Sequence, residues 1–112
     1  MKLYTSQYRY RGIDKLDITV TGNDPIGRYF APTMSLVLGI RDGACSQETY
    51  RTQYDNILRS SLILNPGIWT ALLALDSIVL VCFYKAGSFC HRYLLADFLV
   101  QLGATYCGEV EP

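Results

Sequence analysis

The C-terminal third of the chain most constrains the fold, because its pattern predicts a strand, a loop, a helix and a second strand. Residues 78–84 are apolar on both faces and β-branched at their start, which is typical of a central strand. Residues 91–102 carry apolar side chains on one helical stripe that ends at Gly103, and residues 105–110 alternate as a last strand. A helix of this length between two strands favours a right-handed parallel crossover.

Shorter elements are predicted over the preceding residues. Strands are expected at residues 3–5 and 16–20, and loops at residues 8–12 and 21–27. Three helices are expected: one over residues 33–41, one that begins after the N-cap Ser46, and one that begins after Asn65-Pro66. Trp69, Tyr50 and Tyr54 fall at helical spacing and are predicted to lie in the core. We therefore expect residues 1–112 to form a single three-layer α/β domain, with a small, mostly parallel sheet flanked by helices.

Composition excludes several classes of protein. Half of the residues are hydrophobic and 18% are charged, which argues against intrinsic disorder. Ten basic residues balance ten acidic ones, so no strong field attracts nucleic acid or an anionic membrane. The longest apolar run is far shorter than the ~20 residues of a membrane-spanning helix, and residues 1–7 lack the apolar core of a secretory signal. We expect a cytoplasmic protein whose four cysteines are reduced.

The most informative motif is residues 81–92, which hold two cysteines, the only histidine, a lysine and an arginine. His91 and Arg92 fall in the first turn of the predicted helix, where the helix dipole disfavours cations by ~0.3–1 kcal/mol. Such a sequence is consistent with a phosphate or carboxylate held against the free backbone N–H groups. Ser88 is a candidate N-cap or a further ligand to that anion, and Lys85 lies in the same loop.

The cysteines of this motif have structural and reactive interpretations. Cys82 lies on an apolar strand, which favours a structural role. Cys90 lies at a helix start beside two basic side chains, where the pKa of a thiol is lowered, so both roles stay open. Cys90 and His91 are the candidate catalytic residues. Cys82, Cys90, His91 and Cys107 match no closed zinc spacing, so no metal and no cofactor is predicted.

Two further loops follow predicted strands. Tyr8, Arg9, Tyr10 and Arg11 come after the first strand, and arginine and tyrosine are suited to stacking on bases and binding phosphate. An ordinary solvated loop with its tyrosines folded onto the core is the alternative. Arg28 ends the loop after the second strand. If the three strands are neighbours in a parallel sheet, one crevice receives cations, aromatic rings and a helix N-terminus.

The motif resembles that of the bacterial and phage domain-of-unknown-function family 488. Members carry an apolar strand ending in Cys, a loop with Lys and Gly, and Phe-Cys-His-Arg opening a helix; here Cys82, Lys85, Gly87 and residues 89–92 match. Tyr84 stands where the family often has Glu, so an acid–base role is not carried over. The resemblance covers nearly the whole chain and implies a compact α/β domain without an established reaction.

These observations predict that the protein binds a phosphorylated, nucleotide-derived small molecule at the carboxyl ends of the strands. The family's frequency among phages implies a role in sequestering a signalling nucleotide. The alternative is a Cys- and His-dependent enzyme acting on a nucleotide or nucleobase, and a purely protein-binding role would require a large exposed apolar patch. The sequence leaves a homodimer open. The predicted ligand-binding residues are Tyr8, Arg9, Tyr10, Arg11, Arg28, Lys85, Ser88, Cys90, His91 and Arg92.

Overall fold

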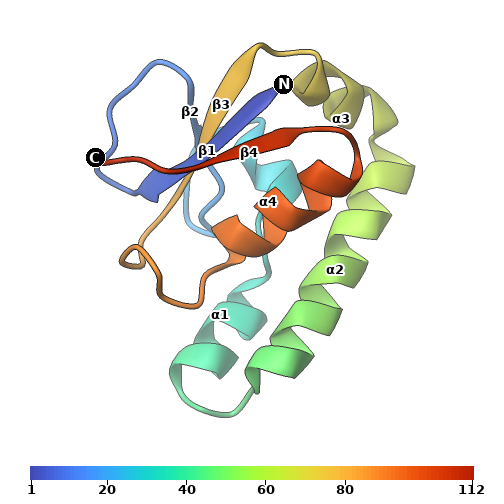
Figure 1. Cartoon of the computed structure of the whole chain (residues 1–112). Coiled ribbons are helices and arrows are strands. Elements are labelled where there is room, and N and C mark those ends of the chain that lie inside the picture. The colour runs from blue at the N-terminus through green and yellow to red at the C-terminus, as the bar shows by residue number, and fades with distance from the viewer.

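A four-stranded sheet, parallel at every strand pair, forms the centre of the computed structural model, which describes residues 1–112 (Figure 1). The strand order is β2-β3-β1-β4. The strands are β1 (Lys2–Gln7), β2 (Lys15–Asp17), β3 (Ser77–Cys82) and β4 (Thr105–Glu109). The predicted α/β class and the parallel crossover from β3 to β4 are therefore confirmed, with β1 lying between these two strands.

Four α-helices and one short 3₁₀ helix connect the strands. They are η1 (Gly27–Phe30), α1 (Met34–Arg41), α2 (Gln47–Leu64), α3 (Pro66–Leu73) and α4 (His91–Gln101). Ser46 caps α2 as predicted, because its hydroxyl accepts a hydrogen bond from the backbone N–H of Thr49 at 3.1 Å. Pro66 begins α3, as the sequence predicts. The 3₁₀ helix was not predicted.

The three layers are the sheet, α4 and α2. Helix α4 packs on β1, β3 and β4, and α2 packs against α4. The loop between β1 and β2 lies on the side of the sheet away from α2 (Figure 1). The carboxyl ends of β1 and β3 and the amino end of α4 consequently lie at one edge of the molecule, where open parallel α/β sheets bind their ligands.

Strand β2 is shorter than predicted, because side-chain hydrogen bonds redirect the backbone after Asp17. The Asp17 carboxylate accepts hydrogen bonds from the backbone N–H and the hydroxyl of Thr19, at 3.0 and 2.7 Å. Asp24 accepts hydrogen bonds from the backbone N–H groups of Asp17 and Gly27. Gly27 packs so closely on the Asp17 carbonyl oxygen that a Cβ atom would overlap it. Local polar contacts thus end the ladder early.

The core contains the apolar faces of the sheet and α4 together with an aromatic cluster. Leu3, Leu80 and Leu95 are fully buried between the sheet and α4. The predicted core positions of Trp69, Tyr50 and Tyr54 are confirmed, since all three side chains are at least 97% buried. The Tyr54 hydroxyl donates to the Phe30 carbonyl, and the indole N–H of Trp69 donates to the Ser61 hydroxyl at 3.0 Å. These bonds satisfy the polar atoms that the cluster buries.

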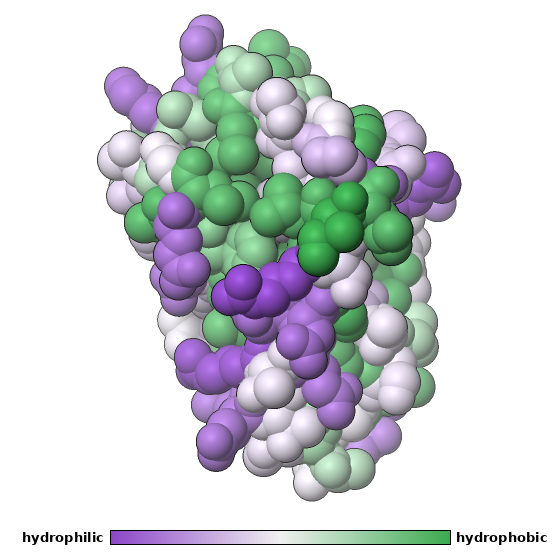
Figure 2. All heavy atoms as spheres, turned by 90° about the vertical axis from the view of Figure 1, so that its right-hand side faces the viewer, coloured by the Kyte–Doolittle hydropathy of each residue, from purple (hydrophilic) through white to green (hydrophobic).

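Apolar side chains also reach the surface where α2 ends and α3 begins. Ile63 and Leu64 are exposed there, and Leu75 is exposed just after α3 ends. Figure 2 shows apolar side chains grouped in the upper half of the face it views, above a more polar lower half. No helix in the structure has both the length and the apolar character needed to cross a membrane.

Candidate functional site at the carboxyl edge of the sheet

Three loops converge at the carboxyl edge of the sheet, because β2, β3 and β1 are consecutive neighbours in its order. The strand order therefore confirms the prediction that these three strands are neighbours in a parallel sheet. The buried polar and charged side chains of the protein all come from the strand ends, the turn after β2 or the first turn of α4; they are Thr5, Ser6, Asp17, Thr19, His91 and Arg92. Burial of polar groups requires partners, and those partners define what each side chain can do.

Arg92 is fully buried and forms an ion pair with Glu109 at the end of β4. Its Nε and Nη2 donate to the two carboxylate oxygens at 3.3 and 2.9 Å, a bidentate arrangement. Partial burial raises the pKa of Glu109, but the hydrogen bonds from Arg92, Thr5 and Tyr93 and the positive charge of Arg92 together outweigh it, so the pKa is lowered. The guanidinium also donates to the Tyr84 carbonyl at 2.8 Å and to the Tyr93 hydroxyl at 3.0 Å. Arg92 is thus held by internal partners.

His91 is buried as well and faces the turn after β2. Its Nε2 lies 2.7 Å from the carbonyl oxygen of Ile18; since a carbonyl only accepts, Nε2 carries the proton and Nδ1 is unprotonated in the neutral ring. Burial lowers the pKa of His91 to about 4, and the hydrogen bond to Ile18 offsets only part of this effect. The unprotonated Nδ1 lies 3.9 Å from Cys90 Sγ. His91 is therefore neutral near pH 7.

The open position expected for His91 and Arg92 is therefore wrong. Both side chains are more than 90% buried and bonded within the protein, so neither faces an open crevice. Helix α4 begins at His91 as predicted. Its N-cap is Cys90, so the prediction that Ser88 caps this helix is wrong. For Arg92 the physical reason is Glu109, which lies further along the chain. Its carboxylate neutralises the guanidinium, a role that the sequence pattern assigned to an external anion.

The sulfur atoms of Cys82 and Cys90 are joined in a disulfide, so the expectation of four reduced cysteines is wrong for this pair. Their Cα atoms lie 7.6 Å apart, and both residues are at least 97% buried. The Nη1 of Arg92 donates to Cys82 Sγ at 3.0 Å and to Cys90 Sγ at 3.5 Å. Cys45 and Cys107 are free. A permanent cation consequently faces both sulfurs.

The same sulfurs and His91 form a group of three potential metal donors. The ligand atoms of Cys82, Cys90 and His91 lie within 4.8 Å of one another. Cys107, the fourth residue considered from the sequence, lies on β4 and does not belong to this group. A divalent ion here would lie against the guanidinium of Arg92, an unfavourable arrangement of like charges, so the donor set fits thiol chemistry better.

Aromatic and basic side chains of the first loop lie outside this buried group. The ring of Tyr8 stacks on that of Phe83, with centroids 4.3 Å apart, and Lys15 Nζ lies 5.0 Å from the Tyr8 centroid. The negative charge of Asp17 raises the pKa of Tyr8. The stack joins the β1–β2 loop to the residue that follows β3, as the convergence of strand ends requires.

The remaining predicted ligand residues do not gather into one cavity. Arg9, Arg11 and Lys85 are exposed and form no salt bridge. The Tyr10 hydroxyl donates to Asp14 at 2.7 Å. The Arg28 guanidinium lies 5.4 Å from the ring centroid of its neighbour Tyr29.

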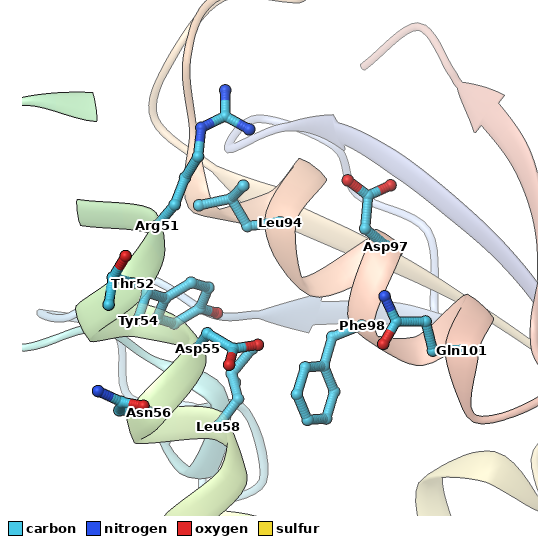
Figure 3. A pocket seen from close by; sticks show the side chains of 10 residues that line it. All are labelled: Arg51, Thr52, Tyr54, Asp55, Asn56, Leu58, Leu94, Asp97, Phe98 and Gln101. Atoms are coloured by element: carbon cyan, nitrogen blue, oxygen red, sulfur yellow. The ribbon is translucent and has the colours of Figure 1, made fainter. Parts of the chain in front are cut away.

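Cys90 is the one cysteine of the pair that lines a sizeable cavity. Its walls include Ser88, Tyr93, Arg51 and Asp97, and its volume is about 360 Å³. An adjoining groove of about 380 Å³ runs between α2 and α4 (Figure 3). The sequence pattern missed Glu109, Arg51 and Asp97, because no local motif marks residues that meet only when helices and strands pack.

The chain was compared with protein-family models, curated proteins and solved structures, and none of them matches it. The resemblance to domain-of-unknown-function family 488 therefore stays a prediction.

Proposed function

We propose that the protein performs thiol–disulfide exchange through Cys82 and Cys90. This develops the cysteine-dependent alternative that the sequence predicts, with a thiol compound in place of a nucleotide as the reactant. The observation that carries it is the contact of Arg92 Nη1 with both sulfurs, at 3.0 and 3.5 Å. A nearby cation lowers the pKa of a thiol and stabilises the thiolate, which is the nucleophile and the leaving group in exchange. Arg92 keeps its charge at every physiological pH.

The reaction balances with two equivalents of an external thiol as the reductant. The thiolate of the first equivalent bonds to Cys90 Sγ, and the electron pair of the broken disulfide goes to Cys82 Sγ as a thiolate beside Arg92. A second thiolate then bonds to the external sulfur of the mixed disulfide and releases the Cys90 thiolate. Two protons from the external thiols end on Cys82 and Cys90. The products are the protein dithiol and one external disulfide.

One feature supports Cys90 as the sulfur that is attacked. Cys90 lines the cavity of about 360 Å³, and Cys82 does not.

Redox titration with alkylation tests this proposal. The protein is equilibrated in buffers of increasing dithiothreitol-to-oxidised-dithiothreitol ratio, quenched in acid, labelled with a maleimide and mapped by mass spectrometry. We expect Cys82 and Cys90 to become labelled together in one two-electron transition, while Cys45 and Cys107 serve as internal controls that are labelled at every ratio. Independent labelling of Cys82 and Cys90, or labelling that never changes with the ratio, would contradict the proposal.

A second candidate function is binding of a phosphorylated, nucleotide-derived molecule at the same edge, and the Tyr8–Phe83 stack favours it. The Phe83 side chain is 60% exposed, so its ring remains accessible for a base to stack upon. Arg9, Arg11 and Lys85 are the exposed cations available for phosphate. A role in sequestering a phage-related signalling nucleotide depends on the family resemblance alone.

Isothermal titration against a panel of mono- and dinucleotides tests this second function. We expect Phe83→Ala to weaken binding by about fivefold to a hundredfold, since loss of stacking on a base costs ~1–3 kcal/mol. Phe89→Ala serves as the matched control, because Phe89 packs on Tyr50 and Arg51 away from that stack. An absence of binding across the panel, or equal affinities for the wild type and Phe83→Ala, would reject nucleotide binding at this edge.

A further inference from the structure

The groove between α2 and α4 carries opposite charges on its two walls and continues into the cavity at Cys90. Both hollows share Arg51 of α2 and Leu94 and Asp97 of α4 as lining residues. Figure 3 shows Arg51 and Asp97 rising from opposite walls on the same side of the groove, with Leu94 between them. The two hollows are therefore adjoining parts of one site.

Neither of these charges is neutralised within the protein. Arg51 and Asp97 are exposed, and the three salt bridges of the structure involve neither of them. The guanidinium of Arg51 lies 5.2 Å from the ring centroid of Phe89, the residue next to Cys90. That contact places the cation of Arg51 beside the residue that precedes Cys90. Asp55, by contrast, is paired with Arg59 at 2.6 Å.

The chemistry of the walls specifies the kind of ligand. A carboxylate is the group that Arg51 binds best, and an ammonium group complements Asp97. Thr52, Asn56 and Gln101 line the rest of the groove with donors and acceptors suited to peptide groups. The volumes of about 360 and 380 Å³ lie within the range of roughly 300–1,000 Å³ that small-molecule sites occupy.

We propose that this groove binds a short peptide thiol with a free carboxylate and a free ammonium group, and presents its sulfur to Cys90. The inference rests on the proposed thiol–disulfide exchange and names its reductant. The ligand's carboxylate lies at Arg51, its ammonium group at Asp97, and its thiolate attacks Cys90 Sγ. The electron pair leaves on Cys82, as in the exchange described above.

Kinetics with two thiols separate binding in the groove from exchange at the sulfur. The oxidised protein is reduced with glutathione, a tripeptide thiol, or with 2-mercaptoethanol, which has neither charge. We expect the rate to saturate with glutathione and to stay linear with 2-mercaptoethanol. Arg51→Gln and Asp97→Asn should each lower the second-order rate constant for reduction by glutathione about tenfold, the loss typical of one charge-assisted hydrogen bond, and change the rate constant for 2-mercaptoethanol much less. Arg41→Gln, at another exposed arginine, is the control.

The outcomes distinguish this inference from the function on which it rests. Linear kinetics with both thiols, unchanged by Arg51→Gln, would overturn the groove assignment and leave the exchange reaction intact. Failure of every thiol to reduce the pair would overturn the exchange. S-methylglutathione, which cannot exchange, then tests the groove alone by NMR titration of the Cys90→Ser variant. Shifts confined to α2 and α4 that vanish in a variant that also carries Arg51→Gln would support the groove, and no shifts would overturn it.

Discussion

Replacement of Arg92 by Met is expected to lower the free energy of unfolding by about 3–5 kcal/mol, the usual cost of removing one partner from a buried ion pair. The side chain of Arg92 is fully buried, whereas that of Glu109 is 22% exposed. Without the guanidinium, the carboxylate loses two hydrogen bonds in a partly desolvated place, and the Tyr84 carbonyl loses its donor. Met has a similar length, which limits the cavity left behind.

Urea denaturation of the wild type and of Arg92→Met under the same redox buffer measures this effect. The matched control is Arg59→Met, which removes the exposed pair between Arg59 and Asp55 on α2. Because an exposed i,i+4 pair contributes ~0.3–0.5 kcal/mol, the control should unfold almost as the wild type does. Equal destabilisation by both substitutions would show that Arg92 does not hold the edge of the sheet together.

The second large effect is a loss of stability on acidification that His91 causes. Its pKa is about 4 in the folded protein, and an unfolded histidine has a pKa near 6.5. Between these values the unfolded chain binds a proton that the folded protein does not, so stability falls as the pH falls from 6.5 to 4. The total contribution is about 3 kcal/mol, present in full above pH 6.5 and lost below pH 4.

His91→Gln isolates this contribution from those of the carboxylates. Glutamine retains an N–H donor for the Ile18 carbonyl and does not titrate, so its stability should fall less steeply than that of the wild type over this window. The charged groups that face the imidazole, Arg92 and Asp17, are the same in both proteins. Chemical denaturation at half-unit intervals from pH 4 to pH 7 gives the two curves. Parallel curves would mean that the pKa of His91 in the folded protein equals that of an unfolded histidine, and would contradict this prediction.

Much of the fold was predictable because its signals are local. The apolar run that became β3 and the stripe and final glycine of α4 each lie within a dozen residues, and together they implied a parallel crossover. Strand β2 was predicted too long, since the hydrogen bonds of Asp17 and Asp24 depend on a turn that periodicity does not describe.

The candidate site was predicted in position but not in its contacts. Residues 81–92 do lie at the carboxyl edge, yet the partner of Arg92 is 17 residues further on and the partner of His91 is 73 residues back. A cation at a helix start has two physical explanations, an external anion or an internal carboxylate, and the sequence pattern does not distinguish them. The pairing of Cys82 with Cys90 also depends on how the first turn of α4 packs beside β3.

The central place of β1 has a consequence for the order in which the protein folds during synthesis. Both neighbours of this early strand, β3 and β4, come from residues 77 onward, so it has no hydrogen-bonded strand beside it while roughly two thirds of these residues are made. Synthesis proceeds at about 5–20 residues per second, so the backbone groups of β1 stay without strand partners for several seconds on the ribosome. The cysteine pair and Arg92 come after that interval, and Glu109 is later still, so the ion pair of the site cannot form before residue 109 has been made.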